Sequence, residues 1–210
     1  MRKVFLLSLL LVVLSLVIPL LVVTLSPAPE PAAQPVPSVT ASSAVAPDSE
    51  TAITALSGGA LVETTMADWL PGVVAAEMPA SFAPEALRAQ AVAARTYILQ
   101  RVRGGAANHP EAGVCDQYTC CCARKDDAAL REQWGADYAR NMARIRQAVT
   151  DTDGQYLTYG GQLIRAVFHA SSAGATESSA ALWSGDAPYL VSVSLSLIHI
   201  SEPTRRVVIS

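Results

Sequence analysis

GVVAAEMPASFAPEALRAQAVAARTYILQR, residues 72–101, is the stretch from which the fold can be read most directly. Pro84 suits the first turn of a helix, and the residues after it carry an apolar stripe at spacings of four, three and four. This pattern predicts a helix from Pro84 to about Arg101. Pro71 and Pro79 delimit a shorter helix before it, over 71–78. The stripe consists of Leu87, Ala91, Ala94 and Ile98.

Two hairpins and a third helix flank this stretch. Gly58-Gly59 separates two short apolar runs within 53–63, and Gly160-Gly161 does the same within 155–169. Apolar residues recur on one side of a helix over 128–149. The sequence therefore predicts an α+β domain whose Ala-rich helices pack on a small antiparallel sheet.

The N-terminal 26 residues predict a transmembrane anchor. Val4 to Ser26 carries no charge and is long enough to cross a hydrocarbon core of about 30 Å. Arg2 and Lys3 precede it, which places the bulk of the chain on the extracytoplasmic side. A cleaved secretory signal is the alternative, and it also exports the domain.

The remaining boundaries follow from composition. Residues 27–50 are rich in Pro, Ala and Ser and predict a disordered linker, so that the folded domain is expected over 51–194. Residues 195–205 read LSLIHISEPTR, which resembles a translated sequencing adapter. We therefore expect 195–210 to be an artefact that replaces the natural C-terminal end. A genuine alternating strand is the other interpretation of this tail.

The charge of the chain excludes one class of function. The formal net charge is −3 over 210 residues. A protein of this sign lacks the basic surface with which nucleic-acid-binding proteins contact phosphates. No nucleic-acid partner is expected.

Glu77 is the candidate catalytic group. It follows small and apolar residues and lies in the last helical turn before Pro79, where the helix dipole disfavours a negative charge. Burial and the dipole both raise a carboxyl pKa, as a general acid requires. The alternative from the residues alone is a structural glutamate that pairs with Arg88 or Arg95.

A cysteine-rich loop is the candidate metal site. His109, Cys115 and Cys121 are spaced six and six, and imidazole together with thiolate suits zinc. The adjacent Cys120 competes with Cys121 for the same role, and one disulfide from Cys115 to a later cysteine is the alternative. His169, farther along the chain, is expected to be a core histidine.

Residues 74–97, VAAEMPASFAPEALRAQAVAARTY, resemble the signature of the stage II sporulation protein D family, and 169–177, HASSAGATE, resemble its second signature. Trp183 and the following Pro-Tyr-Leu resemble the segment after it. The resemblance implies a membrane-anchored lytic transglycosylase that cleaves peptidoglycan glycan strands during engulfment, after a partner amidase has removed the stem peptides. It also implies roles for individual residues: catalysis by Glu77, substrate binding by Arg88, Gln90 and Arg95, and a zinc site of His109, Cys115 and Cys121.

A single carboxyl suffices for this chemistry. Hydrolytic glycosidases use two carboxyl groups, one of which activates water or attacks the sugar. In a lytic transglycosylase the 6-hydroxyl of muramic acid attacks its own C1, so that one residue can act as acid and then as base. The alternatives are a non-catalytic amidase enhancer that binds cell wall and a zinc-dependent wall amidase.

Overall fold

The computed structural model describes residues 40–42, 46–105, 108–169, 174–183, 185 and 187–194, together with 13, 17 and 18. They fall into two compact units. One is Pro37–Ser171, and the other combines Met1–Val36 with Ser172–Ser210. Within the described part of the chain, no helix has both the length and the apolar character needed to cross a membrane. The expected anchor, apart from residues 13, 17 and 18, and the expected artefact at 195–210 lie outside the described residues.

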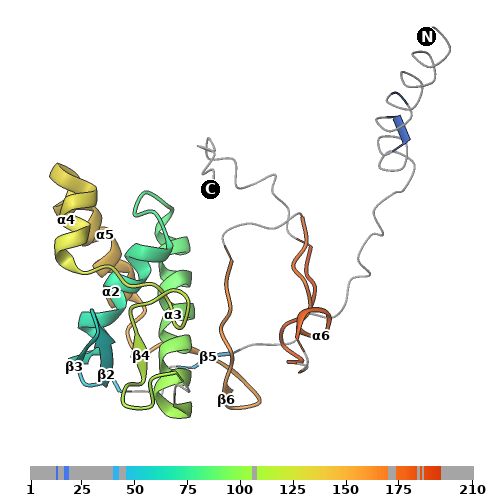
Figure 1. Cartoon of the computed structure of the whole chain (residues 1–210), viewed down its shortest axis with the longest axis horizontal. Coiled ribbons are helices and arrows are strands. Elements are labelled where there is room, and N and C mark those ends of the chain that lie inside the picture. The colour runs from blue at the N-terminus through green and yellow to red at the C-terminus, as the bar shows by residue number, and fades with distance from the viewer. Residues whose placement is uncertain are drawn as a thin grey trace, which may run out of the picture. The chain divides into compact units, whose positions relative to one another are not determined.

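Three helices form the core of the Pro37–Ser171 unit. α2 (Met66–Glu77), α3 (Pro84–Gly104) and α5 (Tyr138–Asp151) pack on one another, and α4 (Asp127–Trp134) adjoins α5 (Figure 1). The apolar stripe predicted for α3 is confirmed, because each of its members is at most 1% exposed. The α+β class is also confirmed.

Two helix boundaries differ from the prediction. α2 begins earlier, because the Thr65 side chain accepts a hydrogen bond from the backbone N–H of Asp68 and so caps the helix, and Pro71 lies inside it. The helix predicted over 128–149 is interrupted by a short 3₁₀ segment, Gly135–Asp137. Gly135 ends α4 with φ of 51°, a conformation that only glycine adopts freely. The interruption turns the chain between α4 and α5.

The strands form two small sheets. β2 (Ala52–Ser57) and β3 (Ala60–Thr65) make the predicted antiparallel hairpin around Gly58-Gly59, and β4 (Val114–Cys115) adds to β2 in parallel. The expectation of one antiparallel sheet is therefore wrong in this detail. In the other sheet, β5 (Tyr156–Tyr159) lies between β1 (Thr40–Ser42) and β6 (Gln162–Leu163). β6 is shorter than predicted, because only Gln162 and Leu163 pair with β5, opposite Tyr159 and Thr158.

The folded unit begins before Thr51, where the linker was expected to end. β1 pairs antiparallel with β5, and its residues lie in the middle of the predicted linker. Asp48 is only 5% exposed, and its backbone N–H donates to Asp153 at 2.7 Å. Part of the Pro- and Ala-rich segment is thus integral to the fold.

In the other unit, described residues between 174 and 194 are joined by hydrogen bonds of their own. Thr176 and Val193 exchange hydrogen bonds, and Ser179 opens the short helix α6 (Ser179–Leu182). The backbone N–H of Ser179 donates to the carbonyl of Leu190. These contacts hold the two ends of 176–193 together.

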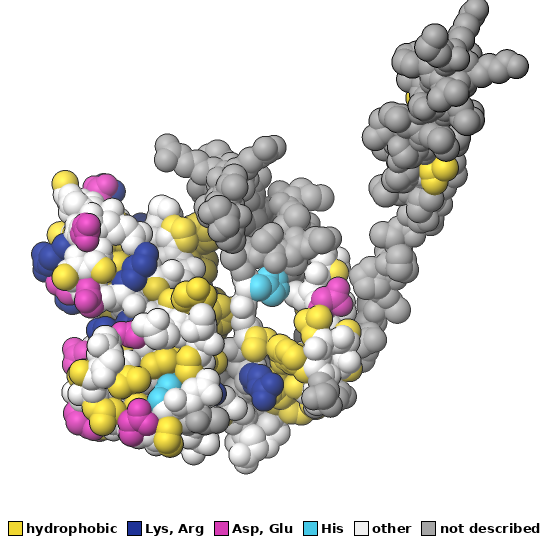
Figure 2. All heavy atoms as spheres, viewed as in Figure 1, with side chains coloured by type: hydrophobic (Ala, Val, Ile, Leu, Met, Phe, Trp, Pro, Cys, Tyr) yellow, Lys and Arg dark blue, Asp and Glu magenta, His cyan; other side chains and the backbone are white. Residues whose placement is uncertain are grey.

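Charge is mixed on the surface. On the face shown in Figure 2, the described Lys and Arg side chains alternate with Asp and Glu side chains instead of gathering into one basic patch.

Candidate functional site

Glu77 is the last residue of α2 and lines a pocket of about 330 Å³. The chain leaves the helix at Met78, whose N–H still donates to the carbonyl of Val74. The end of α2 and the loop after it form one wall of the pocket, and the other wall comes from α4, α5 and Lys125, two residues before α4. The lining residues are Ala75, Ala76, Glu77, Met78, Pro79, Ala80, Ser81, Lys125, Gln133, Trp134, Arg140 and Asn141.

The pKa of Glu77 is raised above its usual value of 4.5. The main cause is burial, because the surrounding protein keeps part of the water away from the carboxyl group although the residue is exposed at the rim. A hydrogen bond from the backbone of Ala123 acts in the opposite direction and favours the carboxylate. The predicted direction of this pKa shift is confirmed. The carboxyl group can therefore exist in the acid form at higher pH than an ordinary glutamate.

Glu77 does not pair with either arginine considered as its structural partner. Arg88 pairs with Asp151 at 2.7 Å, and Arg95 pairs with Asp48 at 2.7 Å. Glu77 is also the one acidic side chain among the described residues that line the pocket. The carboxyl group is therefore available to a ligand.

Four possible metal ligands converge in the loop between α3 and α4. The ligand atoms of His109, Cys115, Cys120 and Cys121 all lie within 4.8 Å of one another. A tetrahedral zinc with Zn–S bonds of about 2.3 Å separates its sulfur ligands by about 3.8 Å. Only a small contraction would therefore close the group around one ion. Cys120 joins the predicted three ligands and does not replace Cys121.

The protonation of the donors is mixed. Burial raises the pKa of Cys115 to about 12, and although burial lowers the pKa of His109, hydrogen bonds with Ala112 and Cys121 raise it to about 9. His109 Nδ1 lies 2.8 Å from the carbonyl oxygen of Ala112, which fixes that nitrogen as the donor and leaves Nε2 facing Cys121 Sγ at 3.3 Å. Burial opposes ionisation of Cys121, but hydrogen bonds from the Cys115 backbone, His109 and Arg101 lower its pKa to about 7. A thiolate is the form that binds metal. Cys122 lies outside the group, and burial raises its pKa to about 12.

The metal-binding loop continues directly into the Glu77 pocket. The backbone of Ala123, two residues after Cys121, lowers the pKa of Glu77. The N–H of Lys125 donates to the carbonyl of Gly72 on α2 at 3.2 Å. A Cβ atom on Gly72 would lie 2.5 Å from the carbonyl oxygen of Lys125, so only glycine permits this approach. The loop is thus seated against the helix that carries Glu77.

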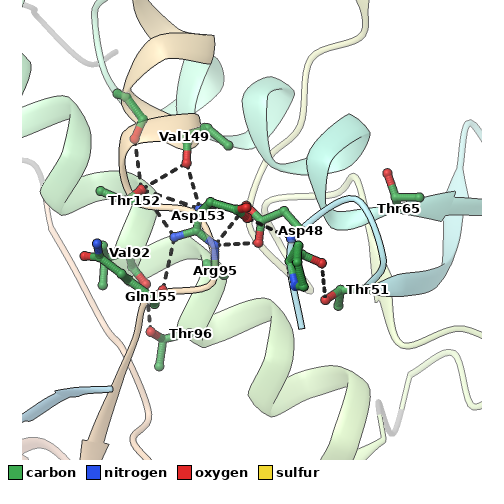
Figure 3. A network of polar contacts seen from close by, with 12 residues as sticks. Asp48, Thr51, Thr65, Val92, Arg95, Thr96, Val149, Thr152, Asp153 and Gln155 are labelled. Atoms are coloured by element: carbon green, nitrogen blue, oxygen red, sulfur yellow. Dashed lines mark hydrogen bonds and ion pairs between the residues drawn. The ribbon is translucent and has the colours of Figure 1, made fainter. Parts of the chain in front are cut away.

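The three residues predicted to bind substrate lie in different environments. Arg88 is 40% exposed and borders a second cavity, between α3 and α5. Gln90 is 8% exposed, and its Nε2 has no hydrogen-bond partner among the described residues. Arg95 is 1% exposed and sits in the network of Figure 3, where Asp48, Thr152 and two backbone carbonyls accept from it. None of the three lines the Glu77 pocket, and their role in substrate binding stays a prediction.

Sequence reasoning missed the far wall of the pocket. Lys125, Trp134, Arg140 and Asn141 reach it from positions 48 to 64 residues after Glu77, and no local pattern signals that approach. The expectation for His169 was wrong, because this residue is exposed and does not belong to the core. Of the second signature, residues 170–173 lie outside the described part.

A family model and three curated relatives match part of this chain. The family model described as Stage II sporulation protein matches residues 57–159, a range that contains both Glu77 and the four metal-ligand candidates. Stage II sporulation protein D of Bacillus amyloliquefaciens is 42% identical over 127 residues, and that of Bacillus subtilis (strain 168) is 43% identical over the same length. Each match covers 60% of this chain and 37% of the relative.

A third relative carries a different name. The amidase enhancer of Bacillus subtilis (strain 168) is 36% identical over 122 residues, which are 58% of this chain and 14% of that protein. This chain therefore spans well under half the length of the curated relatives that it matches. From residue 57 to residue 159, the chain is a domain of the stage II sporulation protein D family.

Proposed function

We propose that this protein is a lytic transglycosylase that cleaves the glycan strands of peptidoglycan during sporulation. The names of two relatives, stage II sporulation protein D, support the biological setting. The observation that carries the chemistry is the pocket of Glu77, in which a carboxyl group with a raised pKa is the one acid among the described lining residues. Hydrolysis by the common route would require a second carboxyl group.

In the proposed reaction Glu77 acts twice. Its protonated form donates a proton to the glycosidic oxygen as the bond from that oxygen to C1 of N-acetylmuramic acid breaks. The 6-hydroxyl of the same sugar then attacks C1, and the Glu77 carboxylate accepts the hydroxyl proton. The products are a 1,6-anhydromuramyl end and a free N-acetylglucosamine hydroxyl, and Glu77 returns to its acid form.

We propose zinc as the metal of the loop, with a structural role. Three thiolates and one imidazole form a donor set typical of closed structural zinc sites, whereas catalytic sites keep a position open for water. When bound, zinc would supply cross-linking of the loop that seats Ala123 and Lys125 against α2. The complete set of four donors argues against a zinc-dependent amidase.

The location and partners belong to the same proposal. The apolar N-terminal segment would anchor the chain so that the domain faces the cell wall. A wall amidase is the proposed functional partner, because it would remove the stem peptides before the glycan is cleaved. The name of the amidase enhancer relative gives independent support to a link with such enzymes.

Glu77→Gln tests the catalytic role, since it keeps the shape of the side chain and removes the titrating proton. Release of anhydromuramyl products from glycan strands without stem peptides should fall by about 10²-fold or more. The wild-type rate should fall as pH rises through the raised pKa, because the acid form starts the reaction. Equal product release by the two proteins, at matched folding, would remove Glu77 from the mechanism.

A non-catalytic amidase enhancer is the second candidate, favoured by the 36% identity to a protein of that name. Product analysis separates the two. Anhydromuramyl ends indicate a transglycosylase. Stimulation of a separate amidase, with no new glycan ends, indicates an enhancer.

A further inference from the structure

Arg101, in the last turn of α3, carries a partly buried positive charge that no carboxylate neutralises. Its guanidinium forms no ion pair with any Asp or Glu that the structure describes, and its buried Nε has no hydrogen-bond partner among the described residues. The ring centroid of Tyr97 lies 6.0 Å from the guanidinium carbon, at the outer limit of a cation–π contact. Buried charges in proteins are normally paired or bound to a metal site, so this cation requires an explanation.

The other arginines of α3 do not share this property. Arg88 and Arg95 each pair with an aspartate at 2.7 Å. Arg103, one turn end farther along, is exposed, so water solvates its charge. Arg101 is therefore the one arginine of this helix whose charge is partly withdrawn from water and has no carboxylate partner.

The Arg101 guanidinium lies against the metal-ligand candidates. Its Nη2 is 3.7 Å from Cys121 Sγ and 3.4 Å from the carbonyl oxygen of Cys120, and it donates to both. Asn108 also donates to this group, from Nδ2 to Cys120 Sγ at 3.5 Å, but that donor is neutral. Among the described residues, Arg101 is thus the one Lys or Arg side chain that hydrogen-bonds a member of the group.

A metal ion bound by this group would leave a charge to be balanced. Three thiolates and one neutral imidazole around Zn²⁺ carry one net negative charge. The site is withdrawn from water, since His109, Cys115 and Cys121 are each at most 8% exposed. A net charge in such surroundings is costly unless an opposite charge is close. The excess charge of the loaded site and the unpaired charge of Arg101 are equal and opposite.

We propose that Arg101 is the charge-balancing partner of the metal site and that its Nη2 contact holds Cys121 in place as a thiolate ligand. This inference rests on the proposed function, in which the loop binds zinc. Hydrogen bonds and charges beside metal-bound sulfur change both the affinity for the metal and the electronic character of the metal–sulfur bond. Because Arg101 belongs to α3 and the ligands to residues 109–121, the same contact joins the metal site to the helix core.

The test compares the zinc affinities of the wild-type 210-residue chain, Arg101→Met and Arg103→Met, each purified in detergent under reducing conditions. Competition with a chromophoric chelator should show that Arg101→Met binds zinc about 10- to 100-fold more weakly than wild type. Arg103→Met is the matched control, because it removes the same charge from the end of the same helix at an exposed position, and it should bind zinc like wild type. Arg101→Lys keeps the charge and should recover part of the lost affinity.

A spectroscopic measurement separates this role from a purely structural one. With Co²⁺ in place of zinc, the thiolate-to-metal charge-transfer bands should shift in Arg101→Met and stay unchanged in Arg103→Met, since Arg101 contacts a ligating sulfur. If Arg101→Met does not fold, Arg101→Lys and Arg101→Gln replace it. The lysine variant should then bind zinc more tightly than the glutamine variant, because glutamine keeps a donor but loses the charge.

The proposal is overturned if Arg101→Met binds zinc as tightly as wild type, if Arg103→Met loses as much affinity, or if the Co²⁺ bands of Arg101→Met do not move. Equal affinities of the lysine and glutamine variants would overturn it as well. A wild-type protein that binds no zinc would refute the zinc proposal and this inference together. Release of anhydromuramyl products reports separately on the transglycosylase, so glycan cleavage by a protein whose zinc affinity does not depend on Arg101 refutes only the role of Arg101.

Discussion

Arg95→Met should remove a large part of the stability of the Pro37–Ser171 unit. The guanidinium donates to both carboxylate oxygens of Asp48, at distances of 2.7–3.1 Å, and to the carbonyl oxygens of Val149 and Gln155 (Figure 3). Methionine fills a similar volume but donates nothing. The substitution therefore leaves one buried carboxylate and two carbonyls without this partner.

The expected loss is about 3–5 kcal/mol, the usual cost of removing one member of a buried ion pair. Domains of this size have a free energy of unfolding of about 5–15 kcal/mol, so the variant should be marginal. Arg88→Met on the same helix is the matched control. Its arginine is 40% exposed, and loss of that surface pair should cost no more than about 1 kcal/mol.

Urea unfolding of the 210-residue chain, followed by circular dichroism, measures both changes. If Arg95→Met does not fold, the double variant Asp48→Leu, Arg95→Met still tests the reasoning, because it removes both charges together. The double variant should be more stable than Arg95→Met alone. A cost for Arg95→Met similar to that for Arg88→Met would refute the argument.

Two further substitutions probe the loop between α3 and α4. Cys120→Ser should weaken zinc binding by at least about 10- to 100-fold, which is the loss typical even for a residue that only hydrogen-bonds a ligand, whereas Cys122→Ser should leave the affinity unchanged. A competition titration with a chelator measures both affinities. Equal affinities of the two variants would show that Cys120 is not a ligand. Gly72→Ala should destabilise the fold by about 1–3 kcal/mol, since its Cβ would lie 2.5 Å from the Lys125 carbonyl oxygen. The control Gly104→Ala, at a site with nothing within 4 Å, should be neutral or stabilising in the same unfolding assay; equal effects would contradict the close packing inferred here.

The features that the sequence predicted well are those that depend on residues close together in the chain. The stripe on α3 follows from helical periodicity, and the Gly-Gly turns of both hairpins need positive φ values that glycine supplies. The raised pKa of Glu77 was also predictable in direction, because its apolar lead-in and its place at the end of α2 are local features.

What the sequence could not supply depends on distant contacts. Arg95 stands in a motif that suggested a surface role, and its partner Asp48 lies 47 residues earlier in a segment with the composition of a linker. Spacing could not decide between Cys120 and Cys121, because only the folded loop shows that both face His109. The sequence did not indicate that Lys125 belongs to the site, because only the folded structure brings it into one pocket with residues of α2 and α4.

The Asp48–Arg95 contact has a practical consequence for dissecting this protein. The family match begins at residue 57, and composition suggests a cut at Thr51. A recombinant fragment started at either point would lose the carboxylate and the β1 strand while keeping the guanidinium in the interior. Such a fragment would be expected to express poorly for reasons unrelated to its chemistry, and a start at or before Pro37 avoids that artefact.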